Sequence, residues 1–350
     1  MYPIRELWLV WFLLLFIFIT SGCNGKDNKK NPVTSNPVPS GVGLVDCGAT
    51  GNVGSLQVTL LAPNQVTTVP AAKVNINHST SGQTICSGNT AADGRIEFQK
   101  LSAGIYHIAS KAGIFEQSLN DITVSAGVTT QQNLALPKDS KKLAVVTGSY
   151  DSIEVVLENL GFSYTVVDAS SLIDTTIVNQ YDFLFLNCGL DETYANDTSA
   201  SVLSNFVSSG KQLYLSDWAY IYLQRAFPGK INFYGDDAID QAAQVGQSGA
   251  VTANVIDKNF ITALGKNTME INFDLPGWVV VDAVNTGVST LITADVTISD
   301  LTTGGDITLT GRPLVTVFNH GSGKVTYTSF HNEAQPTQDM SRALETMLFQ

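Results

Sequence analysis

The sequence lacks a second long apolar run, and this absence limits how the chain can meet a membrane. One unbroken apolar run occupies residues 7–19, and no later run approaches the length of a membrane span. A spanning helix needs about 20 apolar residues, whereas the core of an export signal is shorter. We therefore read residues 7–19 as an export signal and expect no transmembrane helix after it.

Positive charge is also scarce. The chain has 19 Lys and Arg against 31 Asp and Glu, which gives a formal net charge of −12. An acidic surface repels both nucleic acid and anionic lipid head groups. We therefore expect no nucleic-acid partner, and no membrane contact through a basic patch.

Cysteine is rare, and its spacing excludes the common zinc motifs. The four cysteines are Cys23, Cys47, Cys86 and Cys188, with no CxxC and no His/Cys cluster at zinc spacing. The sequence therefore predicts no metal ion and no cofactor. Cys47 and Cys86 lie in one predicted domain, so in an oxidising compartment we expect them to form a disulfide. Cys188 is then left as a free, buried thiol.

The N-terminus carries a processing signal. Arg5 precedes the apolar run, and Thr20, Ser21 and Gly22 lead to Cys23. This ending resembles the bacterial lipobox, in which the signal is removed before the cysteine and the thiol carries a lipid such as palmitate. The resemblance implies a signal peptide over residues 1–22 and a lipoprotein anchored through Cys23 in the bacterial cell envelope, at the outer membrane if the cell is Gram-negative. An ordinary secretory signal is the alternative, since Thr20 stands where leucine is usual.

A polar segment follows the cysteine. Residues 24–42 are mostly Asn, Lys, Pro, Ser and Gly, with almost nothing apolar to bury. Such a segment cannot offset its ordering entropy by packing. We predict a flexible tether over residues 23–52.

Residues 53–137 read as a β-sandwich. Short alternating apolar runs are cut by turn residues, with no helical periodicity. The segments 92–98 (ADGRIEF) and 101–106 (LSAGIY) resemble the DGxFxFxxLxxGxY signature of carboxypeptidase regulatory-like, or transthyretin-like, domains. Domains of that family act mostly as spacers, stabilisers or adhesive modules, so the resemblance implies architecture and no reaction.

Beyond a polar hinge at residues 137–142 the pattern changes to alternating strands and helices. This alternation predicts βαβ units and a parallel sheet, a flavodoxin-like α/β domain over residues 142–350. Near its end, two apolar runs flank a turn at residues 320–323 and form a predicted hairpin that leads to the polar residues 331–335. The predicted strands are 143–146, 164–167, 183–186 and 212–215, and the predicted helices are 150–160, 171–179 and 198–209.

This second domain resembles the class I glutamine amidotransferase-like proteins, nearest their ThuA-like branch. The resemblance rests on residues 142–149, 181–189, 206–217 and 321–329, and it leaves a large insertion near residues 227–310. Active amidotransferases have a nucleophilic cysteine at the elbow after one strand and a His-x-Glu pair late in the chain. Here the elbow position holds Asp217, or Ser216 if the alignment shifts by one residue, and the late pair is His331 and Glu333.

Without the cysteine thiolate, glutamine hydrolysis is not expected. Three interpretations of Asp217, His331 and Glu333 stay open: an acid–base pair, ligands of a divalent ion, or a structural polar network, which we favour. Cys188 ends the preceding strand, where the family uses backbone N–H groups to hold an oxyanion. The candidate pocket comprises Asn187, Cys188, Gly189, Ser216, Asp217, Trp218, His331 and Glu333.

The sequence thus leads to two hypotheses from different classes. The first is a non-catalytic envelope lipoprotein that presents a degenerate amidotransferase-like domain to a carbohydrate or to an envelope protein. The carbohydrate suggestion rests on four aromatic residues near the elbow and in the insertion, Trp218, Tyr220, Tyr222 and Trp278. The second is a hydrolase that uses Asp217, His331 and Glu333, with or without a metal ion. A carboxylate and an imidazole that converge in an open cleft would favour the hydrolase.

Overall fold

Strands make up all of the regular structure between residues 43 and 135. In this computed structural model, residues 41–235, 243–299, 304–332 and 337–350 are described. The first part forms two four-stranded sheets, in the orders β1-β5-β2-β8 and β4-β3-β6-β7. The strands are β1 (Gly43–Asp46), β2 (Val53–Leu61), β3 (Lys73–His78), β4 (Thr84–Asn89), β5 (Arg95–Ser102), β6 (Gly104–Ala112), β7 (Phe115–Val124) and β8 (Thr129–Ala135).

Alternation along these strands explains why they form a layered core. In β2, every second side chain is fully buried, and these include Leu56, Val58 and Leu60. The intervening residues are half-buried on the outer face, which is the pattern of a sheet packed on one side. The predicted strands are therefore arranged in two sheets, as expected for a β-sandwich.

One strand, β1, lies in the segment that the sequence predicts to be a flexible tether. β1 pairs in parallel with β5, from Gly43 opposite Ile96 to Asp46 opposite Gln99. The predicted tether over residues 23–52 includes this strand, because a strand of four residues is too short for its alternation to be recognised in the sequence. Cys47 follows directly and bonds to Cys86 of β4, with the Cα atoms 5.6 Å apart, so the predicted disulfide is confirmed.

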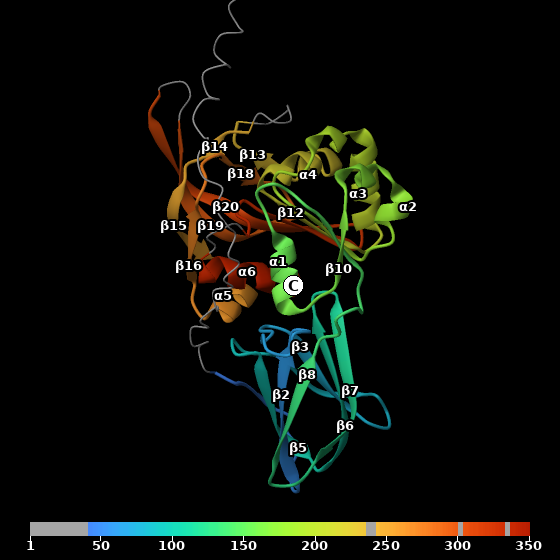
Figure 1. Cartoon of the computed structure of the whole chain (residues 1–350). Coiled ribbons are helices and arrows are strands. Elements are labelled where there is room, and N and C mark those ends of the chain that lie inside the picture. The colour runs from blue at the N-terminus through green and yellow to red at the C-terminus, as the bar shows by residue number, and fades with distance from the viewer. Residues whose placement is uncertain (1–40, 236–242, 300–303, 333–336) are drawn as a thin grey trace, which may run out of the picture. The chain divides into compact units, whose positions relative to one another are not determined.

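The second part is built on one mixed sheet with helices on both faces (Figure 1). Its order is β10-β9-β11-β12-β21-β20-β19-β14-β17, with β15 paired to β19 and β16 paired to β15. The first five strands are parallel, and β20 then runs antiparallel to β21. These strands are β9 (Leu143–Val146), β10 (Tyr164–Val167), β11 (Phe183–Leu186), β12 (Gln212–Ser216), β20 (Asp306–His320) and β21 (Gly323–Thr328).

Two separate clusters of apolar side chains cover the two faces of this sheet. In β11 all four residues are buried, because Phe183 and Phe185 face one layer while Leu184 and Leu186 face the other. The helices α1 (Ile153–Leu160) and α6 (Gln338–Leu348) contribute to the first cluster. The helices α3 (Asp197–Ser208) and α4 (Tyr220–Ala226) contribute to the second. Between α1 and α3 the chain forms three short elements, η1 (Ala169–Ile173), α2 (Thr175–Val178) and η2 (Glu192–Tyr194).

The insertion near residues 227–310 continues the same sheet. Its strands are β13 (Ile231–Phe233), β14 (Val245–Gly246), β15 (Gly249–Val255), β16 (Thr268–Phe273), β17 (Trp278–Val279), β18 (Val281–Val284) and β19 (Val288–Ser299), with the helix α5 (Lys258–Leu264). Among the described strands of the insertion, only β13 and β18 pair apart from the main sheet. The insertion therefore stands beside the parallel strands and can reach their carboxyl ends.

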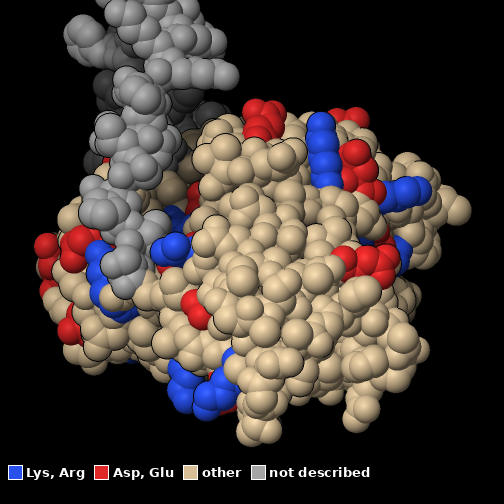
Figure 2. All heavy atoms as spheres, turned by 90° about the horizontal axis from the view of Figure 1, so that it is seen from below, with Lys and Arg blue, Asp and Glu red and all other residues tan. Residues whose placement is uncertain are grey.

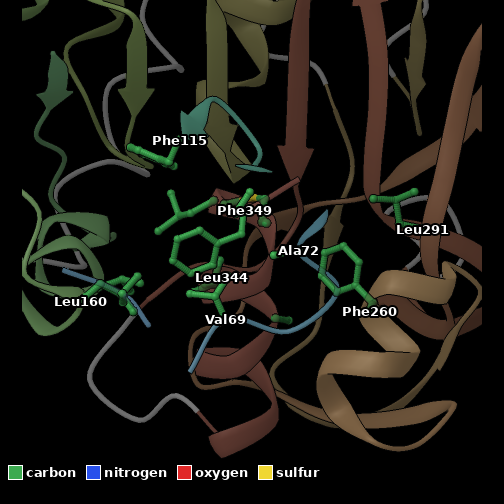
Figure 3. Packing of buried hydrophobic residues seen from close by; sticks show 14 of the residues in the cluster. Val69, Ala72, Phe115, Leu160, Phe260, Leu291, Leu344 and Phe349 are labelled. Carbon is green, nitrogen blue, oxygen red and sulfur yellow. The ribbon is translucent and has the colours of Figure 1, made fainter. Parts of the chain in front are cut away.

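The sandwich and the α/β part share one apolar core, shown in Figure 3. The ring of Phe115, from β7, lies 4.4 Å from that of Phe162 and 6.2 Å from that of Phe349. The side-chain amide of Asn64 donates to the carbonyl of Asn159 at 2.6 Å. The described residues from 41 onward accordingly belong to one compact unit, although their sequence patterns predict two domains.

Charged side chains are sparse on the face drawn in Figure 2, and acidic and basic groups alternate there without forming a basic patch. Within the described residues, no helix is long and apolar enough to cross a lipid bilayer.

Candidate functional site

The ends of four parallel strands bring the candidate residues together. β9 leads to Asp151, β11 to Cys188, β12 to Asp217 and β21 to His331. In the registers, Leu186 lies opposite Val146 and Leu215, and Ser216 lies opposite Thr328. The carboxyl ends of the strands therefore coincide at one edge, which is where open α/β sheets bind ligands.

Asp217 occupies a constrained turn between β12 and the 3-10 helix η3 (Asp217–Ala219), which continues into α4. Its φ angle of 45° is in the left-handed region that side chains other than glycine rarely adopt. Such backbone conformations cluster at functional sites, where the surrounding structure holds them. The elbow geometry is thus present with aspartate at its apex.

Both carboxylate oxygens of Asp217 have partners within the protein. Oδ1 accepts the backbone N–H of Val279 at 2.6 Å. Oδ2 accepts the thiol of Cys188 at 3.3 Å and lies 3.4 Å from Nε2 of His331. The side chains of Asp217 and His331 are only 4% and 8% exposed, so this is a nearly buried acid–imidazole pair.

The surroundings of this pair shift the pKa values of His331 and of the neighbouring Cys188. Burial alone would lower the pKa of His331, but the hydrogen bond to Asp217 and the negative charges of Asp151, Asp217 and Asp274 outweigh it and raise that pKa. Burial, reinforced by the charge of Asp217, raises the pKa of the Cys188 thiol far above its usual value. This direction agrees with the hydrogen bond in which the thiol of Cys188 donates to Asp217.

A buried polar chain that the sequence did not indicate supports this pair. The backbone N–H of Cys188 donates to Oγ of Ser216 at 2.9 Å, and that hydroxyl donates to Asp151 at 2.6 Å. The other oxygen of Asp151 accepts the N–H of Asn332 at 3.0 Å. Burial raises the pKa of Asp151, while the charge of His331 and these hydrogen bonds oppose that rise. Asp151 thereby ties the ends of β9, β11, β12 and β21 together.

Above the pair lies a pocket of about 530 Å³. This volume is within the range of about 300–1,000 Å³ that is usual for small-molecule sites. Its lining combines aromatic and aliphatic side chains with a few polar groups. It consists of Tyr150, Cys188, Gly189, Glu192, Asp217, Trp218, Asn272, Phe273, Asp274, Leu275, Pro276, Gly277, Trp278, Phe330, His331 and Met340.

Two tryptophans form part of the wall, each fixed by its indole N–H. Trp218 donates to the carbonyl of Gly277 at 2.8 Å, and Trp278 donates to that of Gln247 at 3.0 Å. Trp278 also stacks on Phe273, with the ring centroids 3.9 Å apart. Of the four aromatic residues behind the carbohydrate suggestion, Tyr220 and Tyr222 cannot reach a ligand, since they are 0% and 1% exposed and belong to the apolar core beneath the sheet end.

The structure separates the sequence-based candidates into three groups. Cys188, Gly189, Asp217, Trp218 and His331 line the pocket. Asn187 and Ser216 are fully buried behind it, and the amide of Asn187 donates to Glu154 at 2.8 Å and to the backbone carbonyl of Asp151 at 3.2 Å. Glu333 and the lipidation candidate Cys23 lie outside the described residues.

Apart from Trp278, sequence reasoning missed the wall that the insertion supplies. Residues 272–278, from the end of β16 to the start of β17, line one side of the pocket, and the negative charge of Asp274 acts on His331. A usable signal was present in Asp274, Pro276, Gly277 and Trp278, since an acid and an indole flank a Pro-Gly turn there. Nothing in the linear spacing indicated that this loop reaches the strand ends.

Comparison with known proteins finds similar solved structures but does not assign the chain to a family. No protein-family model matches the sequence, and no curated protein matches it. Among solved structures, the chain is similar to a candidate GMP synthase component from Thermoplasma acidophilum, with 13% identity over 59% of this chain and 92% of that one, at a TM-score of 0.41.

It is also similar to a ThuA-like protein from Bacteroides uniformis, with 11% identity over 60% of this chain and 89% of that one, at a TM-score of 0.41. The major pilin BcpA of Bacillus cereus is similar over 25% of this chain and 31% of that one, with 16% identity and a TM-score of 0.21. ThuA-like proteins, which the sequence resembles, are therefore among the structural neighbours. The chemistry of the site is derived from its own residues.

Proposed function

We propose that this protein is an envelope-anchored lipoprotein that binds a small polyhydroxylated ligand, of the size of a mono- or disaccharide, in the pocket above Asp217. One observation supports the proposal. Tryptophan and phenylalanine side chains line the same pocket, of about 530 Å³, as carboxylate and imidazole groups. Aromatic faces pack against the C–H faces of sugars, and a few convergent polar groups fix their hydroxyls.

The polar groups of the pocket suit neutral hydroxyls. Glu192, Asp274 and the carbonyl of Asn272 can accept O–H groups, while the amide of Asn272 and the imidazole of His331 can donate. An anionic ligand would meet the carboxylates of Glu192, Asp217 and Asp274 at close range. The lining thus favours an uncharged polyol over a phosphate or carboxylate ligand.

The remaining parts of the chain have supporting roles in this proposal. Cys23 would carry the lipid and residues 24–42 would hold the folded part away from the membrane. The β-sandwich, which resembles transthyretin-like domains, would serve as the spacer that presents the pocket. The disulfide between Cys47 and Cys86 accords with an oxidising compartment.

Hydrolysis is the second candidate, and a specific observation favours it. Asp217 has the strained φ angle of an elbow, and it converges with His331 at the floor of an open pocket. In that case His331 would be the general acid or base, and Asp217 would orient it. The hydrogen bonds to both oxygens of Asp217 suit it to orient His331 and not to attack a substrate. The binding role is preferred because the aromatic wall of the pocket suits the face of a bound sugar.

Tryptophan fluorescence tests the binding proposal. The four tryptophans are Trp8, Trp11, Trp218 and Trp278, so a full chain with Trp8→Phe and Trp11→Phe reports from the pocket alone. We expect a saturable fluorescence change with at least one member of a panel of neutral mono- and disaccharides. Asp274→Asn should weaken that response, and the exposed control Asp121→Asn should not.

No response from any sugar of the panel at about 10 mM, where a site with a Kd of about 1 mM is mostly filled, would overturn the saccharide proposal. The hydrolase alternative is tested separately with a panel of nitrophenyl esters and glycosides. Turnover that His331→Gln abolishes would favour hydrolysis over binding.

A further inference from the structure

The floor of the pocket brings together three metal-ligating side chains of different chemistry. We propose that Cys188, Asp217 and His331 bind one divalent transition-metal ion of the zinc class. Their ligand atoms, one sulfur, one oxygen and one nitrogen, all lie within 4.8 Å of one another, and all three residues are buried. This proposal does not depend on which ligand occupies the pocket above.

Two of the three separations between the ligand atoms are close to those of a tetrahedral ion. With bonds of about 2.3 Å to sulfur and about 2.0–2.2 Å to nitrogen and oxygen, the ligand atoms of a tetrahedral zinc site are about 3.3–3.7 Å apart. Here Oδ2 of Asp217 lies 3.3 Å from Sγ of Cys188 and 3.4 Å from Nε2 of His331. The third separation, between the ligand atoms of Cys188 and His331, is within 4.8 Å, and a bound ion would draw these two side chains toward one centre.

The coordination sphere would be open on one side. All three residues line the pocket, so a fourth position faces its interior. Three protein ligands with one open position are the arrangement of a zinc site that binds water or a substrate, whereas structural zinc sites are closed by four protein ligands. Thiolate and imidazole ligands select zinc or cobalt over magnesium and calcium, which prefer oxygen.

Surrounding groups orient two of the three ligands, Asp217 and Cys188. The N–H of Val279 holds Oδ1 of Asp217, which leaves Oδ2 for the ion. The backbone of Cys188 is fixed through Ser216 to the buried Asp151. Such outer partners fix ligand geometry and typically contribute about ten- to a hundredfold to metal affinity.

Charge and proton balance agree with the proposal. In the ion-free protein the thiol proton of Cys188 is donated to Oδ2 of Asp217, close to where the ion would lie. Binding would release that proton, and any proton on Nε2 of His331, to solvent. A thiolate and a carboxylate would then neutralise the two positive charges of the ion, which suits a buried position.

Cobalt titration of the full chain tests this site. With Cys23→Ser in place and Cys47 bonded to Cys86, Cys188 is the remaining thiol. We expect one equivalent of Co²⁺ to bind, with a thiolate-to-cobalt charge-transfer band in the near ultraviolet and release of at least one proton. Zinc should displace the cobalt and remove the band.

Cys188→Ser should abolish the band, and His331→Gln should weaken binding by about a hundredfold or more, since loss of a direct ligand exceeds the effect of an outer partner. Asp121→Asn, which changes an exposed carboxylate outside both the pocket and the three ligands, is the control and should leave the affinity and the stoichiometry unchanged. Circular dichroism establishes that each variant is folded.

X-ray absorption at the zinc edge gives a result that needs no variant. We expect one sulfur ligand at about 2.3 Å together with nitrogen and oxygen ligands. Substoichiometric cobalt, a missing thiolate band in the parent, or a zinc spectrum with nitrogen and oxygen ligands alone would overturn the proposal.

Discussion

Asp217 combines two constraints that usually oppose stability. Its backbone has a φ angle of 45°, and its carboxylate is nearly buried beside an imidazole and a thiol. Asparagine tolerates the left-handed region and can still accept the N–H of Val279 through its carbonyl oxygen. Alanine can do neither.

We therefore expect Asp217→Ala to be less stable than Asp217→Asn. The left-handed backbone and the unpaired N–H of Val279 should together lower the free energy of unfolding by about 1–3 kcal/mol relative to the asparagine variant. Urea denaturation of the two variants measures this difference. Equal stabilities would mean that the elbow is relaxed and that its backbone is not strained.

The residue types at this site could be predicted from the sequence, but their arrangement could not. Asp217 and His331 were predictable because each follows a recognisable strand of the parallel sheet. Cys188 was expected to be a buried thiol, yet it also faces the pocket and donates to Asp217. Its closeness to His331 depends on the strand order β11-β12-β21, in which residues far apart in sequence become neighbours.

The loops after β9 and β11 must approach closely for the site to form. Gly148 lies so near that a Cβ atom there would be 1.9 Å from the carbonyl oxygen of Cys188. Side chains larger than hydrogen would force the two loops apart, because the obstructing atoms are backbone. The glycine is therefore a requirement of the site.

Gly148→Ala should lower the free energy of unfolding by about 1–3 kcal/mol and weaken ligand and metal binding by moving Cys188. The matched control is Gly104→Ala, since a Cβ atom there meets its nearest heavy atom at 3.8 Å. Denaturation and the tryptophan response are measured on both variants. If Gly148→Ala behaved like the control, the two loops would be free to separate.

A hydrogen bond between helix α1 and strand β10 makes a pH-dependent contribution. The hydroxyl of Tyr164 donates to Glu158 at 2.6 Å, and this bond, with burial and nearby acidic charge, raises the pKa of Tyr164 to about 12. In the unfolded chain the phenol ionises near pH 10. The contribution is therefore fully present below about pH 10 and is lost as the pH rises toward about 12.

Tyr164→Phe should consequently lose less stability than the parent between about pH 10 and pH 12. Urea denaturation at several alkaline pH values compares their slopes. Identical slopes in parent and variant would show that Tyr164 ionises equally in the folded and unfolded chains.

Helices and strands with a strong periodic pattern could be predicted from the sequence. The helix predicted over residues 150–160 is α1, and the hairpin around residues 320–323 is β20 and β21. The strand β1 and the pocket wall at residues 272–278 were missed because each depends on a partner strand, which a local pattern does not contain. Their positions follow from tertiary pairing.

The disulfide connects the two sheets of the sandwich, since β1 and β4 belong to different sheets. It links Cys47, just after β1, to Cys86 in β4, with a sequence separation of 39 residues. A crosslink over a loop of this length stabilises a protein by about 2–4 kcal/mol, chiefly by limiting the unfolded chain.

Replacement of both cysteines by alanine should lower the free energy of unfolding by about 2–4 kcal/mol. Because the sandwich and the α/β part share Phe115, Phe162 and Phe349 in one cluster, the loss should shift a single cooperative transition. Calorimetry measures both features. Two resolved transitions in the parent would contradict a shared core.

We propose that the Asp217–His331 pair serves ligand binding in the pocket and not the stability of the fold. The unfolding free energy of Asp217→Asn, relative to the parent in urea, tests this claim most directly. Asparagine removes a buried charge while keeping the acceptor for Val279, so we expect a value within about 1 kcal/mol of the parent, or above it. A loss of about 3–5 kcal/mol, the effect of breaking a buried structural ion pair, would contradict the claim and make the pair part of the scaffold.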